Sequence, residues 1–168
     1  MSSSTRVQLT LFINDIYAGE IERVRVQYNP VQYSLIKSHV TLCREDELMP
    51  AEILPEVLGR LRHQPIGVQF DTPARFCNNK GVLLPAKGDN GPFNSLRKAV
   101  LSNRPGQPRK HDPHITLMHP RNSTCTNEIF AEISRLRFPA QILFNTVSLI
   151  EQTGNGPWKT LAEYQLIG

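Results

Sequence analysis

The sequence contains one four-residue pattern twice, as His39-Val40-Thr41-Leu42 in its first half and His114-Ile115-Thr116-Leu117 in its second half. Alternate side chains of a β-strand share a face, so each tetrad presents an imidazole and a hydroxyl side by side. The apolar residues of each tetrad point the other way and can anchor the strand in a hydrophobic core. We therefore expect two equivalent strands that bring two histidines and two threonines into one cleft.

The two tetrads begin 75 positions apart, at residues 39 and 114, which is close to half of the 168-residue chain. Both halves also show the same predicted order of strand, helix, strand, helix and strand. Similarity at a single offset indicates a duplicated unit. We therefore predict a single bilobal α+β domain over residues 1–168, with pseudo-repeats at about 6–77 and 81–167. Two antiparallel sheets, related by a pseudo-twofold axis and flanked by helices, should enclose the cleft between them.

Hydrophobic periodicity and helix-breaking residues place the individual elements. Strands are predicted at residues 7–13, 38–43, 66–70, 82–85, 114–118, 142–150 and 161–167. Helices are predicted after a cap at Asn14 or Asp15, between Pro50 and residue 61, and over residues 93–101 and 129–136. Asn29-Pro30 should stop the first helix, and the turn-rich residues 153–157 should join the last two strands as a hairpin.

Composition and charge describe a globular protein with a mild preference for anionic partners. Hydrophobic residues make up 39% of the chain and charged residues 20%, which is unlike a disordered or coiled-coil sequence. Lys and Arg number 19 against 15 for Asp and Glu, a net charge of +4. A protein dedicated to duplex nucleic acid carries a denser basic stripe, so this charge favours a small phosphorylated ligand or a short RNA end.

The cysteines and the chain ends indicate the cellular setting. Cys43, Cys77 and Cys125 are odd in number and widely spaced, and they form neither a CxxC pair nor a zinc-like grouping. The N-terminal residues lack the apolar stretch of a signal peptide, and no segment has the length of a membrane span. We therefore expect a cytoplasmic, monomeric protein with reduced thiols and no membrane partner.

Two histidines and two threonines in one cleft suit the chemistry of a phosphodiester. Hydrolysis needs a base for the attacking group and an acid for the leaving oxygen, and histidine serves both roles near neutral pH. Threonine hydroxyls can donate hydrogen bonds to the non-bridging oxygens, where the transition state holds negative charge. This scheme requires neither a metal nor a cofactor. His63 and His111 stand without a carboxylate or thiol at ligand spacing, and no glycine-rich phosphate loop is present, which disfavours an ATP-driven ligase.

A single tetrad would be explained most simply by packing, as a histidine beside a β-favouring threonine on a half-buried strand. The pair changes that interpretation. Two copies at equivalent places in a duplicated architecture are hard to explain by packing alone and indicate a site.

The paired tetrads resemble the motifs of the 2H (two-histidine) phosphoesterase superfamily, which includes the 2′-5′ RNA ligase-like proteins of bacteria and archaea and the cyclic phosphodiesterases. The resemblance covers nearly the whole chain. It implies a bilobal duplicated α+β fold and the hydrolysis or reversible formation of 2′-linked or 2′,3′-cyclic phosphodiesters. It also implies that His39 and His114 are the acid/base pair, that Thr41 and Thr116 hold the phosphate, and that RNA ends or small nucleotides are the partners.

Many members of this superfamily resemble His-x-Thr-Leu-x-Arg in at least one motif, with the arginine helping to hold phosphate. In this sequence Arg44 follows the first tetrad and His119 the second, so both are candidate phosphate ligands. Strict alternation would turn both side chains away from the catalytic face, so each reaches substrate only if its strand ends or bends there. The alternative is that both are ordinary surface residues.

Other basic and aromatic residues are placed less clearly by the sequence. Lys87 and the run Arg109-Lys110-His111 fall in predicted loops, where their charges would be solvated and could guide an anion towards the cleft. Trp158 and Phe76 could stack a base. Packing is the simpler explanation for both aromatic side chains, and we do not predict either as a site residue.

Three functions share the predicted cleft. The leading hypothesis is a metal-independent phosphodiesterase that hydrolyses 2′,3′-cyclic phosphates or 2′-5′ bonds. The same cleft could instead bind a phosphate or an RNA end with little turnover, an alternative that the net positive charge and the substituted His119 motivate. It could also catalyse reversible 2′-5′ RNA ligation, with an RNA 5′-hydroxyl as the attacking group. The sequence leaves open which histidine is base and which is acid, because the two motifs are nearly equivalent.

Overall fold

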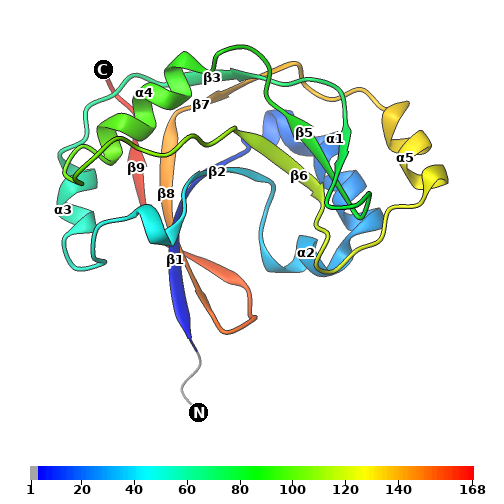
Figure 1. Ribbon diagram of the computed structural model, residues 1–168, viewed down its shortest axis with the longest axis horizontal. Helices are drawn as coiled ribbons and strands as arrows, with labels where there is room; N and C mark the ends of the chain where they lie inside the picture. The colour runs from blue at the N-terminus through cyan, green and yellow to red at the C-terminus, as the bar shows by residue number, and fades with distance from the viewer. Residues whose placement is uncertain (1–3) are drawn as a thin grey trace.

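Strands and helices occupy similar shares of the computed structural model, which describes residues 4–168 (Figure 1). The strands are β1 (Thr5–Phe12), β2 (His39–Cys43), β3 (Ile66–Gln69), β4 (Ala74–Phe76), β5 (Gly81–Pro85), β6 (His114–Met118), β7 (Gln141–Phe144), β8 (Thr146–Thr153) and β9 (Trp158–Gln165). The helices are α1 (Asp15–Tyr28), α2 (Pro30–Leu35), α3 (Leu54–Gly59), α4 (Gly91–Val100) and α5 (Asn127–Ser134), with a short 3₁₀ turn η1 (Glu45–Glu47) after β2.

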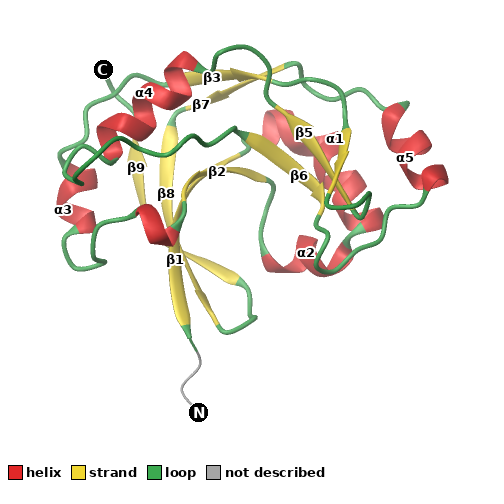
Figure 2. Cartoon of the chain, in the orientation of Figure 1, coloured by secondary structure: helices red, strands yellow, loops and turns green. Residues whose placement is uncertain are grey.

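Seven strands form one antiparallel sheet in the order β4-β5-β6-β2-β1-β8-β9. A second antiparallel sheet pairs β3 with β7. Figure 2 shows the helices arranged around these strands, and α1 lies against β6 while α4 lies against β3. The predicted α+β class with two antiparallel sheets is confirmed. The division into pseudo-repeats at 6–77 and 81–167 stays a prediction.

The two tetrads occupy neighbouring strands in the middle of the large sheet. β2 and β6 run antiparallel and pair at Val40 and Ile115. The tetrads therefore meet as neighbours within one sheet, which differs from the expected arrangement on two separate sheets across a cleft. The apolar side chains of both tetrads are fully buried, so the alternation that the sequence predicts holds within each tetrad.

Local signals explain where the first helices begin and end. The side chain of Asn14 accepts a hydrogen bond from the Ile16 N–H and caps α1, as predicted. α1 ends at Tyr28, also as predicted, but Pro30 then begins the short helix α2, where the sequence predicts a loop. Proline favours the first turn of a helix, because it lacks an N–H and its φ is already helical.

Two predicted elements differ from the structure, and one strand was not predicted. The helix expected from Pro50 begins only at Leu54, because Pro55 belongs in the first turn of a helix and interrupts a longer one. The strand expected over 142–150 is divided at Asn145 into β7 and β8, which belong to different sheets. Apolar residues resume at Val147, directly after Asn145 and Thr146, so the sequence does not clearly mark a break there. β4, with three residues at the sheet edge, was also not predicted.

The predicted hairpin over 153–157 is present between β8 and β9. Among the described residues, no helix has the length and apolar character that crossing a membrane demands.

Candidate active site

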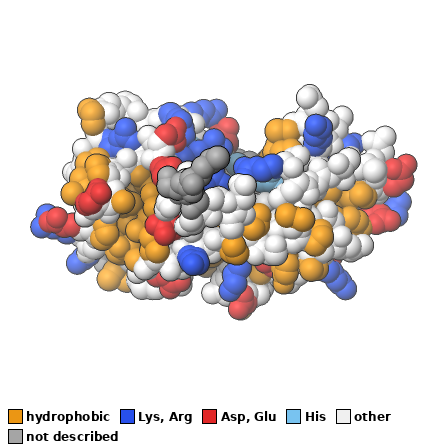
Figure 3. All heavy atoms as spheres, turned by 90° about the horizontal axis from the view of Figure 1, so that it is seen from below, with side chains coloured by type: hydrophobic (Ala, Val, Ile, Leu, Met, Phe, Trp, Pro, Cys, Tyr) orange, Lys and Arg blue, Asp and Glu red, His pale blue; other side chains and the backbone are white. Residues whose placement is uncertain are grey.

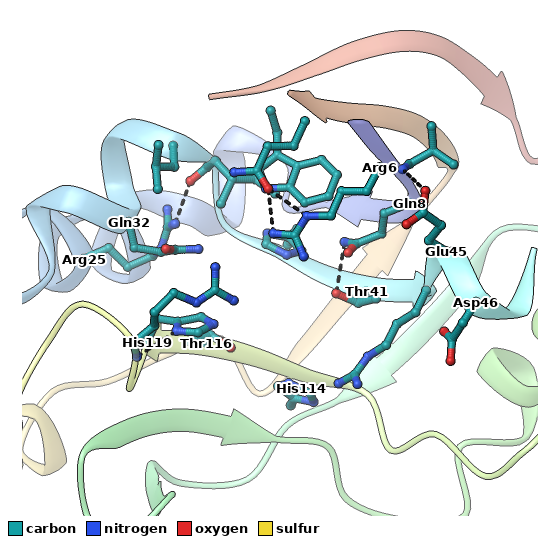
Figure 4. A pocket seen from close by; sticks show the side chains of 18 residues that line it. Arg6, Gln8, Arg25, Gln32, Thr41, Glu45, Asp46, His114, Thr116 and His119 are labelled. Atoms are coloured by element: carbon teal, nitrogen blue, oxygen red, sulfur yellow. Dashed lines mark hydrogen bonds between the residues drawn. The ribbon is translucent and has the colours of Figure 1, made fainter. Parts of the chain in front are cut away.

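A cavity of about 470 Å³ opens on the polar face of β2 and β6 (Figure 4). His39 and Thr41 reach it from β2, and His114 and Thr116 reach it from β6. The structure therefore brings together all four residues that the tetrads predicted. Figure 3 shows histidine side chains near the middle of this face of the molecule, next to Lys and Arg side chains.

The same backbone contact orients both histidines. Nδ1 of His39 lies 2.7 Å from the carbonyl oxygen of Lys37, and Nδ1 of His114 lies 3.0 Å from the carbonyl oxygen of Asp112. A carbonyl can only accept a hydrogen bond, so each Nδ1 carries a proton and donates it. In the neutral ring Nε2 is then an unprotonated acceptor. Each histidine therefore has one nitrogen fixed by the backbone and one left for a ligand.

The surroundings of His39 favour its neutral form. Burial is the main reason that the pKa of His39 falls to about 4, and the positive charge of Arg25 lowers it further. The hydrogen bond to the Lys37 carbonyl acts in the opposite direction without cancelling the effect. At neutral pH His39 therefore has an unprotonated Nε2 and can accept a proton.

A β-bulge in β2 brings Arg44 to the cavity. The pairing of β1 with β2 shifts between Leu9 and Thr10, so Leu42 is an extra residue on β2. Leu42 and Cys43 are consecutive and both fully buried, which interrupts the alternation. The next side chain, Arg44, returns to the polar face and lines the cavity. Strict alternation would turn Arg44 away, but the bulge is a bend of the kind that the sequence required for Arg44 to reach the cavity.

β6 has a bulge at the matching position. Its pairing with β5 shifts between Val82 and Leu83, so Leu117 is the extra residue. Leu117 and Met118 are both fully buried, and His119 then lines the cavity. Both candidate phosphate ligands that follow the tetrads therefore reach the site by the same distortion of their strands.

His119 is held in the cavity wall by its neighbours. Its backbone N–H donates to Asn29 Oδ1 at 2.7 Å, and its Nδ1 accepts from the Arg121 N–H at 3.1 Å. Burial lowers the pKa of His119, and the charges of Arg121 and Arg6 lower it further. With Nδ1 accepting, the neutral ring carries its proton on Nε2, so His119 can donate a hydrogen bond to an anion.

A buried arginine stabilises the bulge of β2. Arg97, on α4, donates from Nη1 to the carbonyl oxygen of Leu42 at 2.5 Å. Its Nη2 lies 2.6 Å from Oε2 of Glu47, and both side chains are buried. The bulge removes the Leu42 carbonyl from regular strand pairing, so the bond from Arg97 replaces a partner that a buried carbonyl needs.

His111 supports β2 from the side of the core. Its Nε2 lies 3.0 Å from the carbonyl oxygen of Thr41 and donates to it, and its ring stacks on Phe93 with a centroid distance of 6.1 Å. Arg109, two residues earlier, forms an ion pair with Asp46 at 2.9 Å. These loop residues, like the exposed Lys87, do not line the cavity.

Several cavity residues were not predicted from the sequence. They are Arg6, Gln8, Arg25, Gln32, Arg121, Gln152 and Trp158. Trp158, which the sequence did not mark as a site residue, lines the cavity, whereas Phe76 lies on the edge strand β4 and does not. The i, i+2 spacing of Arg6 and Gln8, at the start of the strand predicted over 7–13, was a usable signal once that strand begins before Arg6, because alternate residues share a face. Gln152 and Trp158 are brought in by long-range strand pairing, and Arg25 and Gln32 by helices α1 and α2.

Gln8 sets the direction of the Thr41 hydroxyl. Its Nε2 donates to Thr41 Oγ1 at 3.2 Å, as the dashed line in Figure 4 shows. Because the hydroxyl oxygen accepts this bond, its own proton remains available to donate to a ligand. Among the hydrogen bonds of the described residues, Thr116 receives no such contact. The two threonines therefore differ, although their strands match.

Solved structures of other proteins share this fold. The crystal structure of E. coli LigT complexed with phosphate matches with a TM-score of 0.65 at 18% identity, over 99% of this chain and 100% of that chain. A protein described as a phosphoesterase matches with a TM-score of 0.66 at 16% identity, over 98% and 100%. The TT0787 protein of Thermus thermophilus matches with a TM-score of 0.58 at 18% identity, over 97% and 98%. The class of fold is therefore the LigT-like α+β fold.

The profile of the 2′-5′ RNA ligase superfamily matches residues 15–156. The chain belongs to this superfamily, so the resemblance to the 2H phosphoesterases is confirmed. Membership indicates an enzyme with phosphodiesterase or ligase chemistry. No curated protein sequence matches the chain.

Proposed function

We propose that the protein is a metal-independent phosphodiesterase that hydrolyses 2′,3′-cyclic phosphates or 2′-5′ phosphodiester bonds of RNA ends or small nucleotides. The observation that carries this proposal is the matched orientation of His39 and His114. Both rings line one cavity beside a threonine and have Nδ1 fixed by a backbone carbonyl. Two such imidazoles supply the base and the acid that the reaction needs.

His39 is the base and His114 the acid in the hydrolytic direction. The lowered pKa of His39 leaves Nε2 free to take a proton from a water molecule as that water attacks phosphorus. As the acid, His114 begins the cycle with a proton on Nε2 and gives it to the leaving oxygen as the bond from phosphorus to that oxygen breaks. The leaving oxygen is the 2′ or 3′ oxygen of a cyclic phosphate, or the 5′ oxygen of a 2′-5′ bond. The new phosphate keeps the attacking oxygen, and one proton passes from His39 back to His114 through solvent to complete the cycle. No step requires a metal.

The phosphate is held by donors on both motif strands. The hydroxyls of Thr41 and Thr116 donate to the non-bridging oxygens, and Arg44 and His119 add a charged and a neutral donor. E. coli LigT has been crystallised with phosphate and with 3′-AMP, which supports an anion-binding role for this type of fold.

The test uses EDTA-treated protein with nucleoside 2′,3′-cyclic phosphates and 2′-5′-linked dinucleotides. His39→Ala and His114→Ala should each lower kcat/KM by about 100- to 10,000-fold. His63→Ala is the matched control, because His63 bonds Ser95 and does not line the cavity. Unchanged turnover in both cavity variants, or loss of wild-type turnover on removal of metal, would contradict the proposal. Binding of the substrates without any product would instead favour a binding module.

Ligation uses the same cyclic-phosphate chemistry with a different attacking group, and the name of the superfamily supports it as a second function. An RNA 5′-hydroxyl would replace water, His39 would take its proton, and His114 would protonate the 3′ oxygen as its bond to phosphorus breaks. The two histidines exchange roles only in the reverse direction, when a 3′-hydroxyl attacks the 2′-5′ bond and the 5′ oxygen leaves. Incubation of an RNA ending in a 2′,3′-cyclic phosphate with a high concentration of a 5′-hydroxyl RNA should then yield a 2′-5′ junction. Absence of joined product would restrict the enzyme to hydrolysis.

A further inference from the structure

One wall of the cavity is a row of three side chains on three adjacent strands: Arg6 on β1, Gln152 on β8 and Trp158 on β9. Arg6 is paired in register with Gln152, and Gln152 with Trp158. Directly opposed residues of neighbouring strands project on the same face of a sheet. All three residues line the cavity that contains the histidines. We refer to them as the Arg6 row.

Arg6 is held in one orientation by the other two members of the row. Its Nε and Nη2 donate to Oε1 of Gln152 at 2.8 and 2.5 Å. Gln152 is itself buried, and its Nε2 donates to the carbonyl oxygen of Gly156 at 2.7 Å, so its amide group is fixed in one orientation. The guanidinium carbon lies 5.0 Å from the centroid of the Trp158 ring. A ligand would therefore meet a cation whose side-chain entropy is already reduced.

The charge of Arg6 is not neutralised by its partners. Gln152 is an uncharged acceptor, and in the part of the chain that the structure describes no carboxylate forms an ion pair with Arg6. The buried Arg25 on the same cavity, by contrast, is paired with Glu22. The field of Arg6 reaches into the cavity, because it contributes to the lowered pKa of His119. A fixed and uncompensated cation is the arrangement that an anion site requires.

One face of the Trp158 ring lies against the guanidinium of Arg6, so that face is not available to stack a nucleobase. The guanidinium in turn has N–H groups beyond the two that Gln152 accepts. These donors suit a phosphate group, which an arginine fork can bind through two oxygens.

We infer that the Arg6 row binds a second phosphate of the substrate, the one on the 5′ side of the nucleoside whose 2′,3′ end is hydrolysed. This inference rests on the proposed function, in which the scissile phosphate occupies the histidines and threonines. The other anion of such a nucleotide is its 5′-phosphate, and in RNA the same position is the phosphodiester to the preceding nucleotide. The row thus makes the enzyme prefer 5′-phosphorylated nucleotides and RNA ends over cyclic nucleosides.

The test compares adenosine 2′,3′-cyclic phosphate with the same compound bearing a 5′-phosphate and with a dinucleotide that ends in a 2′,3′-cyclic phosphate. Wild-type kcat/KM should be about tenfold higher for the two compounds with a 5′-side phosphate. This factor is the lower end of what a charge-assisted hydrogen bond contributes, because Arg6 is solvent-exposed. Arg6→Gln should abolish this preference, and Arg6→Lys should retain most of it. A preference for the 5′-phosphorylated mononucleotide but not for the dinucleotide would restrict the site to free nucleotides.

Lys159→Gln is the matched control. Lys159 follows Trp158 on β9, so its exposed side chain points to the opposite face, and the substitution removes the same charge. The substrate preference should survive in this variant. Equal turnover of all three substrates by the wild type, or an unchanged preference in Arg6→Gln, would overturn the inference. An equal decrease in kcat/KM for all three substrates in Arg6→Gln would also overturn the inference, and would indicate that Arg6 binds the nucleoside.

A binding measurement separates this inference from the proposed function. If the wild type turned over none of the three substrates, the proposed function would fail. Calorimetry with adenosine 3′,5′-bisphosphate and 3′-AMP would still test the row, because the two ligands differ only in the 5′-phosphate. The bisphosphate should bind about tenfold more tightly to the wild type and equally to Arg6→Gln. Equal affinities for the wild type would refute the second phosphate site.

Discussion

The role of His39 as the base can be tested by lowering the pH. Burial and the charge of Arg25 lower the pKa of His39 to about 4. A base must be unprotonated, so kcat/KM should decline only as the pH approaches that value. At pH 5, about 90% of a group with a pKa of 4 is neutral, against about 3% of a histidine with its ordinary pKa. We therefore expect roughly 30-fold more activity at pH 5 than an unperturbed histidine would allow.

The assay follows kcat/KM for a nucleoside 2′,3′-cyclic phosphate from about pH 3.5 to about pH 8 at constant ionic strength, with folding checked by circular dichroism. The acidic limb should have its midpoint near pH 4. In His39→Ala this limb should disappear together with most of the activity. Added imidazole should restore part of the activity, with a midpoint at its own higher pKa. A wild-type midpoint near pH 6.5 would refute the effect of burial, and survival of the limb in His39→Ala would assign it to another group.

Two further substitutions test the contacts that support β2. Gln8→Glu replaces the amide donor with a carboxylate that accepts the Thr41 hydroxyl proton, so kcat/KM should fall by about 10- to 100-fold, and by clearly more than in Gln8→Ala. Equal losses in these two variants in steady-state assays would argue against an orienting role. Arg97→Met removes the close partner of the buried Glu47 and leaves only Arg109 at 3.6 Å, so urea titration should show a loss of about 3 kcal/mol, the lower end for a broken buried pair, in the free energy of unfolding. The added substitution Glu47→Gln should recover part of that loss, and a loss below about 1 kcal/mol in Arg97→Met alone would contradict the buried ion pair.

The two motif strands are equivalent in backbone and different in surroundings. Each has a bulge after its threonine, and each histidine donates from Nδ1 to the carbonyl oxygen two residues earlier. The side chains that approach them differ, because Gln8 contacts Thr41 while Arg25 acts on His39. Two strands of matching backbone thus present two histidines in the same orientation, while the neighbouring side chains give them different electrostatic surroundings.

The bulges also show why strand alternation predicts side-chain directions correctly within each tetrad but not after it. Within each tetrad the side chains alternate as a regular strand requires, and the sequence predicts their faces correctly. One inserted residue then reverses the faces for everything that follows, so Arg44 and His119 reach the cavity. The bulge of β2 depends on Arg97, which lies 55 positions from Leu42 in the chain. No pattern near the tetrad could reveal that contact.

The tetrads by themselves determined that each histidine lies beside its own threonine, because an imidazole and a hydroxyl two residues apart on a strand share a face. They also indicated the fold class, through their repetition at half the chain length. Only the tertiary structure determined the walls of the cavity. Arg6 and Gln152 are 146 positions apart, and they meet because β1 pairs with β8 in one particular register. Register depends on the packing of whole sheet faces, so it cannot be derived from any short stretch of sequence.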